Sequence, residues 1–311
     1  MEHTKMTTRL TQALEGEDLQ DATRERVLID ARQLEEWYIG TYGHGLDPDD
    51  VALTSMDLAE FRGWLLRRGC QPSTLQRKFA SIRSVLKLLA PQVLTTVRMP
   101  KLPKPSKPAP SGFTRTERLA IFRAADKLSP RDRAIVYLAM WTAGRSSSIA
   151  EAKLSNVDLR PRSGSITYDV TKGGPGRSYS VPLNVEARTA LEAWIAVRPP
   201  VQHDHLFTAE RYPFDPITRW TMHDIWHRRL AKHLPKELAG RLKGLHDARH
   251  ALARMLVDGH SGPNGQPVPL SDAAAILNHS SVATTANIYC RPSERDLRGH
   301  LERAVGEEPE D

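Results

Sequence analysis

A proline- and lysine-rich stretch constrains the fold most, because neither a helix nor a sheet strand can run through it. From Met99 to Pro110 every second or third residue is proline, and the charged residues are three lysines. Proline fixes φ and lacks an amide hydrogen, so this segment should be extended and rather stiff. The length of 311 residues also indicates two domains, at roughly 100–200 residues each. We therefore expect a first domain over 1–98, a linker over 99–111 and a second domain over 112–311.

The first domain has apolar residues at helical spacing nearly throughout. After a polar start, helical patterns run from Thr23 and again from Thr54, and a third begins near Ser73 with an apolar stripe on one side. Its opposite side is basic, with no acidic residue from Ser73 to Leu89. Such charges are usually just solvated, but the lack of acids favours contact with DNA phosphates. The candidate DNA contacts here are Arg77, Lys78 and Ser81, and Lys101 and Lys104 of the linker are either further contacts or part of a solubilised tether.

The second domain changes from helical to strand periodicity and back. Helical patterns begin at Thr114 and Ser129, and the second of them ends at the small-residue segment 142–144. Residues 165–170 and 177–181 alternate as strands around a glycine-rich turn, which predicts a hairpin. That turn lacks the residue order of a nucleotide-binding loop and no helix follows it, which argues against an ATP site. The expected fold is mainly α-helical with a small antiparallel β element.

The charge balance points to an anionic partner. The net charge is +7 and the pI about 9.5, although a merely basic protein would look the same. Eight basic residues against two acids between Trp226 and Arg254 support a polyanion-binding surface, with Arg228, Arg229 and Lys243 as candidate contacts. The two cysteines form no metal-ligand spacing, and no apolar run is long enough for a bilayer, so we expect a cytoplasmic protein without a metal.

Side chains suited to phosphate chemistry gather in the last third of the chain. Residues 244–250 contain His246, Arg249 and His250, and they are followed by His279 and Tyr289. Arginine matches phosphate oxygens with parallel donors, histidine moves protons near neutral pH, and tyrosine can form a covalent intermediate. Each residue alone is explained as well by packing. Their combination predicts a site that holds a phosphodiester and attacks it with a phenol.

In this combination and order the chain resembles the tyrosine recombinases, also called phage integrases. The resemblance covers nearly the whole chain and includes the helical first domain, the linker and the hairpin. Arg145 follows a small-residue turn as the first arginine of that family does. The hairpin lysine matches Lys172, with Arg177 after it, and the H-x-x-R element matches His246 and Arg249. Later matching positions are His279 and Tyr289.

The resemblance implies a helical core-site-binding domain, a catalytic domain and a metal-free, cofactor-free reaction. Tyr289 would attack the scissile phosphate, leaving a 3′-phosphotyrosine and a free 5′-hydroxyl. The other expected roles are contact with the non-bridging oxygens for Arg145 and Arg249, protonation of the leaving oxygen for Lys172, base or orienting group for His246, and a phosphate hydrogen bond for His279. His250 is expected to be a second-layer or packing residue. Arg177 is a further candidate DNA contact.

Two positions depart from the family pattern. The family usually has an acid three residues after the first arginine, whereas this chain has Ser148; Glu151, one helical turn further on, is a candidate substitute. Before the late histidine this chain has Asn278 where glycine is common. Asparagine also tolerates a left-handed helix end, so the turn is expected to persist.

The resemblance also implies the partners. They are double-stranded DNA with inverted half-sites and three further copies of the chain, giving a homotetramer on DNA that can be a monomer without it. The expected function is site-specific recombination that integrates or excises mobile DNA. Two alternatives remain: a type IB-like topoisomerase, and a non-catalytic DNA-binding protein with the same fold.

Overall fold

The computed structural model describes residues 5–17, 19, 21–47, 52–104, 112–160, 163–169, 177–259, 267–278 and 281–289. By its internal contacts the chain divides into two units, Met1–Lys107 and Pro108–Asp311. The division falls inside the segment expected to be a linker. Met99 and Leu102, from the start of that segment, are half-buried against the core of the first unit.

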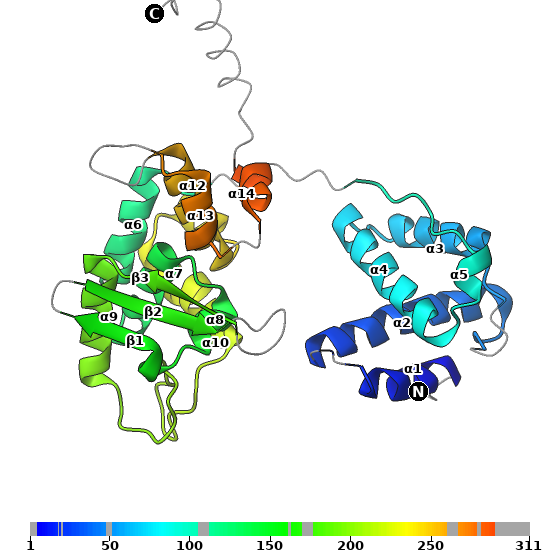
Figure 1. Ribbon diagram of the computed structural model, residues 1–311, viewed down its shortest axis with the longest axis horizontal. Helices are drawn as coiled ribbons and strands as arrows, with labels where there is room; N and C mark the ends of the chain where they lie inside the picture. The colour runs from blue at the N-terminus through cyan, green and yellow to red at the C-terminus, as the bar shows by residue number, and fades with distance from the viewer. Residues whose placement is uncertain are drawn as a thin grey trace, which may run out of the picture. The chain divides into compact units, whose positions relative to one another are not determined.

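The first unit is built from helices around a single apolar core (Figure 1). They are α1 (Lys5–Glu15), α2 (Asp21–Tyr42), α3 (Ser55–Arg67), α4 (Pro72–Leu89) and the short α5 (Val93–Thr96). The Thr54 side chain and Asp57 form a capping box at the start of α3. Helix α4 begins one residue before Ser73, with proline at its first position. Its apolar stripe, including Leu75 and Ile82, is buried as the periodicity predicted.

Part of the basic side of α4 is turned towards Asp30 of α2. Nη1 of Arg77 lies 2.5 Å and Nζ of Lys78 2.9 Å from the Asp30 carboxylate, whose side chain is 1% exposed. Burial alone would raise the pKa of Asp30, but hydrogen bonds from Arg77, Lys78 and Ser81 hold it below its ordinary value. The three residues expected to contact DNA are thus engaged inside this unit. The sequence pattern of α4 could not reveal a carboxylate contributed by another helix.

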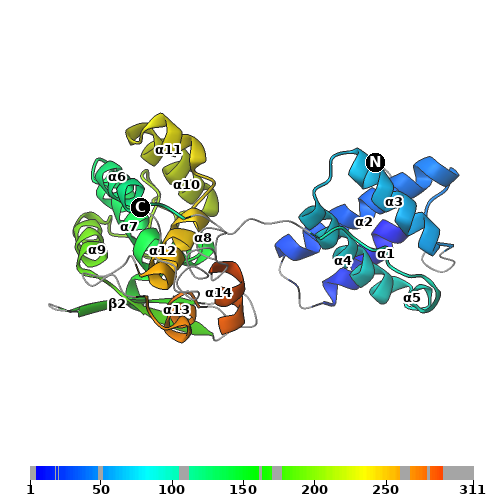
Figure 2. The ribbon, with the colours of Figure 1, turned by 90° about the horizontal axis from the view of Figure 1, so that it is seen from above.

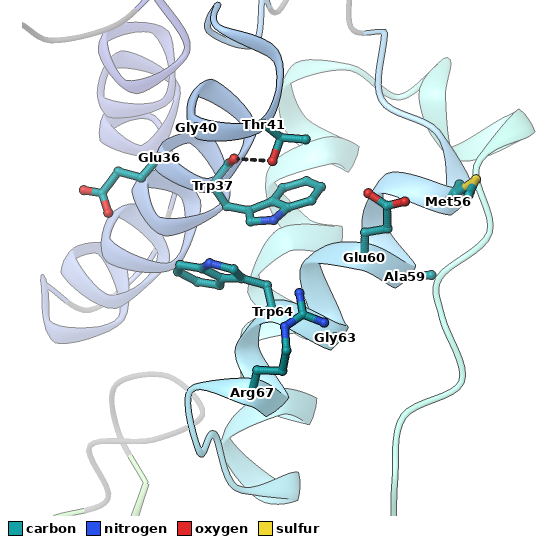
Figure 3. A pocket seen from close by; sticks show the side chains of 10 residues that line it. All are labelled: Glu36, Trp37, Gly40, Thr41, Met56, Ala59, Glu60, Gly63, Trp64 and Arg67. Carbon is teal, nitrogen blue, oxygen red and sulfur yellow. Dashed lines mark hydrogen bonds between the residues drawn. The ribbon is translucent and has the colours of Figure 1, made fainter.

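A groove of about 840 Å³ lies on the first unit between α2 and α3 (Figure 3). Trp37 and Trp64 line it, and two glycines of the same helices, Gly40 and Gly63, leave it open. Met56, at its edge, is 70% exposed. The groove contains none of the residues expected to carry chemistry, all of which belong to the second unit.

The second unit has α7 (Pro130–Thr142) at its centre, buried along most of its length. Before it lies α6 (Arg115–Ala125), which opens with the expected capping box of Thr114 and Glu117. After it come α8 (Ser146–Ala150), the 3₁₀ turn η1 (Leu154–Asn156) and the strands β1 (Val157–Arg160), β2 (Ser163–Asp169) and β3 (Ser178–Pro182). The described strands form an antiparallel sheet in the order β1-β2-β3, and Ile166 pairs with Val181 on its buried face. The expected hairpin strands are therefore present.

Helices complete the second unit and place its candidate residues. They are α9 (Val185–Val197), which packs on α7, α10 (Arg219–Asp224), the π-helical segment η2 (Ile225–Leu230), the 3₁₀ turn η3 (Ala231–His233), α11 (Lys236–Arg241), α12 (His246–Asp258), α13 (Leu270–Ile276) and α14 (Val282–Tyr289). Helices α12, α13 and α14 contact one another (Figures 1 and 2). The expected fold class, mainly α with a small antiparallel sheet, is confirmed. Of the helices described, none combines the length and apolarity that a bilayer span requires.

The Asp30 cluster gives a stability prediction. Asp30→Ala should destabilise the protein by about 1–3 kcal/mol, because the partly exposed Arg77 and Lys78 lose their charge-assisted hydrogen bonds, as measured by urea unfolding. Asp21→Ala is the matched control, because Asp21 pairs with Arg24 while 97% exposed, and it should change stability little. Equal effects of the two substitutions would mean that the Asp30 cluster does not stabilise the unit.

Candidate active site

One tight turn between α7 and α8 positions the first arginine. Ala143 ends α7 in the left-handed region, with φ of 51°, and Arg145 is the N-cap of α8. A Cβ added to Gly144 would lie 2.8 Å from Cγ1 of Ile149 and 3.1 Å from Cζ of Tyr168. Small residues are therefore required by packing at this turn. The Arg145 side chain is exposed, and its guanidinium forms no hydrogen bond or ion pair with another described residue.

The second arginine, Arg249 of α12, is held by main-chain carbonyls. It is only 3% exposed and donates from Nη1 to the Ala143 oxygen at 2.7 Å and from Nη2 to the Leu277 oxygen. Ala143 is the C-cap of α7 and Leu277 the C-cap of α13. Helix C-termini carry partial negative charge, so they stabilise a buried cation without a carboxylate. The turn between α7 and α8 thus positions both arginines. Arg145 follows the turn directly in the chain, and Arg249 is held by a hydrogen bond to the turn's Ala143 oxygen.

The two arginines repel each other, and the site is therefore suited to an anion. Burial and then the charge of Arg145 lower the pKa of Arg249 below its ordinary value. A lowered pKa means that the cationic form of Arg249 is disfavoured at this position. A phosphate between the guanidiniums would relieve the repulsion, as two arginines matched to its oxygens do elsewhere.

The phenol of Tyr289 lies beside the same group of residues. Tyr289 ends α14, is 2% exposed and packs in a small core with Ala143, Leu252 and Leu277. Its Oη is 2.6 Å from Nδ1 of His250, and its main-chain oxygen accepts a hydrogen bond of 3.0 Å from Arg254. Burial raises the pKa of Tyr289, and the charges of Arg249 and Arg254 oppose that rise. The phenol is thus protonated and needs an acceptor before it can attack.

His250, rather than His246, is the described imidazole hydrogen-bonded to the phenol. Burial, together with the charge of His246, lowers the pKa of His250 to about 4, so its ring is neutral at pH 7 and Nδ1 can accept the phenolic hydrogen. His246 stands one helical turn away, with ring centroids 4.7 Å apart. Desolvation and the charges of Arg249 and Arg145 lower the pKa of His246. His246 is therefore influenced by the two arginines, whereas His250 contacts the Tyr289 phenol.

The sequence pattern alone gave no role to Tyr179. This β3 residue is paired with Tyr168 on β2, and its hydroxyl is buried. Burial raises the pKa of Tyr179, while Arg249, Arg145 and the Ser148 hydroxyl lower it. Ser148 is itself buried, whereas Glu151 is exposed and makes no ion pair with Arg145 among the described contacts. A period-two strand pattern can mark Tyr179 as inward-facing but cannot show what it faces.

The other expected residues fall into three groups. Lys172 and His279 lie outside the described residues, so their roles stay predictions. Arg229 is engaged by acids, with Nη1 at 2.9 Å from Asp132 and Nε at 2.8 Å from Asp224, and is not a free DNA contact. Exposed side chains are found at Lys101, Lys104, Arg177, Arg228 and Lys243. Asn278 has φ of 46°, so the expected left-handed turn before the late histidine is confirmed.

The fold and this group of residues define a class of DNA-processing proteins, and comparison with known families agrees. The model of the phage integrase family matches residues 113–295. The chain belongs to that family, and the resemblance read from its motifs is confirmed.

Individual relatives carry matching names. The chain is 33% identical over 181 residues to a putative integrase/recombinase, y4rF, of Sinorhizobium fredii, covering 56% of this chain but only 38% of that protein. It is 29% identical over 247 residues to the tyrosine recombinase XerC of Myxococcus xanthus, covering 76% of this chain and 78% of that one.

Solved structures show the same fold. The Tn1549 transposon integrase, in complex with transposon right end DNA, has a TM-score of 0.70 at 16% identity and covers 97% of this chain and 100% of that chain. The XerH site-specific recombinase, bound to difH substrate, has a TM-score of 0.67 at 17% identity, with 97% and 85% covered.

The crowded turn gives a prediction. Gly144→Ala should destabilise the protein by about 1–3 kcal/mol, because the new methyl displaces Ile149 or the Tyr168 ring, as measured by urea unfolding. Gly240→Ala, where a Cβ meets nothing within 4 Å, is the control and should be neutral or stabilising by up to about 1 kcal/mol. If both substitutions were tolerated equally, packing would not be what requires glycine at 144.

The shifted histidine predicts a pH dependence of stability. The pKa of His250 is about 4 in the folded chain and ordinarily 6.5, so between these values the unfolded chain binds the extra proton. Stability should therefore fall as the pH drops below about 6.5. His250→Gln should show a smaller loss of stability between pH 7 and pH 5 than wild type, by urea unfolding at each pH. The pKa of His246 is also lowered, so the stability of the His250→Gln protein should still fall somewhat as the pH drops. Identical slopes would contradict the assignment.

Proposed function

We propose that the protein is a site-specific DNA recombinase that cleaves and rejoins DNA through a 3′-phosphotyrosine, integrating or excising mobile DNA. One observation carries this proposal: the phenol of Tyr289 is hydrogen-bonded to a neutral imidazole beside two arginines that form no ion pair with an acid in the described part of the chain. A nucleophile, a proton acceptor and an anion site thus stand together, as covalent catalysis on a phosphodiester requires.

The reaction balances without hydrolysis. Oη of Tyr289 forms a bond to the scissile phosphorus while its proton passes to His250, with His246 as a further acceptor. Arg145 and Arg249 face the non-bridging oxygens, where negative charge grows. The bond to the 5′-oxygen breaks, and that oxygen takes a proton from Lys172, while His279 donates a hydrogen bond to the phosphate. A 5′-hydroxyl from another strand then attacks the phosphotyrosine, and the tyrosine recovers its proton.

The burial of Tyr289 adds a step before chemistry. A phenol that is 2% exposed cannot reach a duplex where it stands. Helix α14 must shift from α12 and α13 when DNA binds, so that the phenol leaves the small apolar core around Leu252 and Leu277. The exposed form is then stabilised by the phosphate between the arginines.

The proposed partners follow from the chemistry. Exchange between two duplexes breaks four strands, and each break needs its own tyrosine, which supports a homotetramer on paired inverted half-sites. Without DNA, we propose that a monomer is possible. The proposed phosphate contacts are the exposed Lys101, Lys104, Arg177, Arg228 and Lys243. Because the substrate is DNA, we keep the cytoplasm as the proposed location.

The test is to trap the covalent intermediate. A duplex selected from random sequences by binding is nicked near the cleavage position, so that the released fragment diffuses away. Wild type should accumulate a protein–DNA adduct, and Tyr289→Phe should form none because the attacking oxygen is missing. Tyr212→Phe, at a side chain that is 86% exposed, is the matched control and should react like wild type.

The outcomes separate the alternatives. Adduct formation followed by crossover between two duplexes supports recombination. Adduct formation with relaxation of supercoils and no crossover product would replace it with a topoisomerase. Tight binding without any adduct from wild type would leave a non-catalytic DNA-binding protein.

A further inference from the structure

The groove between α2 and α3 of the first unit has aromatic walls and an exposed apolar edge. Its volume is about 840 Å³, and the indoles of Trp37 and Trp64 line it (Figure 3). Both rings are held from below by Phe61, with ring centroids 5.4 and 5.7 Å apart. Met56 lies at the edge with 70% of its surface exposed. An exposed apolar side chain beside an aromatic groove is typical of a surface that another helix covers.

Two glycines in this groove are not required by the fold of the unit. Gly40 lies inside α2 and Gly63 inside α3, where glycine is less favourable than alanine, and neither has a positive φ. Among the described residues, a Cβ at Gly40 would meet nothing within 4 Å. At Gly63 it would meet only the end of the Arg67 side chain, at 3.3 Å. Glycine at these positions does, however, allow the backbone of another helix to approach closely.

The charges along the groove are complementary to themselves. Glu60 and Arg67 are exposed, line the groove and lie about two helical turns apart on α3. Neither side chain forms an ion pair with another described residue. A second α3 that runs antiparallel presents these charges in the opposite order, so each glutamate meets an arginine. With Glu36 as a second acid in the groove, DNA phosphates are disfavoured as the occupant.

A twofold axis that crosses α3 next to Phe61 brings these features together. Two antiparallel helices related by this axis place Glu60 of one copy within about one helical turn, about 5.4 Å along the axis, of the partner's Arg67. Side chains of this length span that gap. Met56 of one copy comes equally close to the partner's Gly63, where the missing side chain leaves room for it. Each contact occurs twice, because both copies use the same surface.

We propose that the groove between α2 and α3 is a docking surface for a second copy of this chain, in which the two α3 helices pack antiparallel. This pairing goes beyond the proposed function and does not depend on it, because it forms without DNA. One helix and the edge of another give a small interface, so the dimer is weak, with a Kd of about 10–100 µM. At nanomolar concentration the chain is therefore a monomer.

The first test reverses the charges, with sedimentation velocity of the full chain from about 1 to 300 µM as the measurement. Wild type should pass from monomer to dimer over this range. Glu60→Arg and Arg67→Glu should each weaken the dimer at least about tenfold, because like charges then face each other, and the double variant should return to within about threefold of wild type. Glu25→Arg, at an exposed residue of α2 outside the groove, is the matched control and should dimerise like wild type.

Two results of the charge reversal would overturn the proposal. Wild type that stays monomeric over the whole range would show that the groove does not bind a second copy. A double variant that is as weak as the single variants would show that Glu60 and Arg67 do not face each other across a twofold axis.

The second test fills the groove without disturbing the unit. Gly63→Leu should weaken the dimer at least about tenfold but melt at the same temperature as wild type or higher, because leucine favours the helix and its Cβ meets only the flexible end of Arg67. Gly240→Leu is the matched control, since a Cβ there also meets nothing within 4 Å, and its dimer should be unchanged. Undiminished dimerisation of Gly63→Leu would place the contact elsewhere and refute the proposal.

Failure of this pairing and failure of the proposed function give different results, because sedimentation is measured without DNA. A chain that forms no covalent adduct but dimerises as described loses the recombinase proposal and keeps the docking surface. A chain that forms the adduct but stays monomeric without DNA loses only the docking surface.

Discussion

The hydrogen bonds that hold the buried guanidinium of Arg249 are the interaction on which the second unit depends. Burying an unpaired charge is costly, and here the cost is offset by the carbonyl ends of α7 and α13. A single side chain on α12 therefore joins the C-termini of two other helices. The residue proposed to hold the phosphate therefore also connects these helix ends, so a substitution of Arg249 is expected to affect stability as well as the site.

The backbone at both helix ends is adapted to that residue. Ala143 and Asn278 adopt positive φ, which is unfavourable for residues with a Cβ. At the end of α7, the left-handed residue is Ala143, and its own carbonyl accepts the hydrogen bond from Arg249. At the second, the left-handed residue follows the carbonyl of Leu277. The strain is local, and the hydrogen bonds that follow from it tie together segments more than a hundred residues apart in sequence, as between Ala143 and Arg249.

Sequence reasoning succeeded where the determining interactions are local. Helix periodicity, capping boxes such as Thr114 with Glu117, and the alternation of the hairpin strands are read within a few residues, and the structure has these elements. It could not identify partners that come from another element. Asp30, 47 residues before Arg77, forms ion pairs with Arg77 and Lys78, and the periodicity of α4 alone does not show them. The choice between His246 and His250 depends on where α14 docks, 39 residues after His250.

A phosphate held between the two arginines would oppose part of the positive field at the site. Without DNA, burial and then the charges of Arg249 and Arg145 lower the pKa of His246, and burial and then the charge of His246 lower the pKa of His250. A phosphate anion between Arg145 and Arg249 would cancel part of that positive field and raise both pKa values. The same anion makes the phenolate of Tyr289 harder to form, so the phenol depends more on a proton acceptor. The anion also makes His250, the acceptor, a stronger base. Under the proposed mechanism, substrate binding would thus strengthen the proton acceptor that attack on that substrate requires.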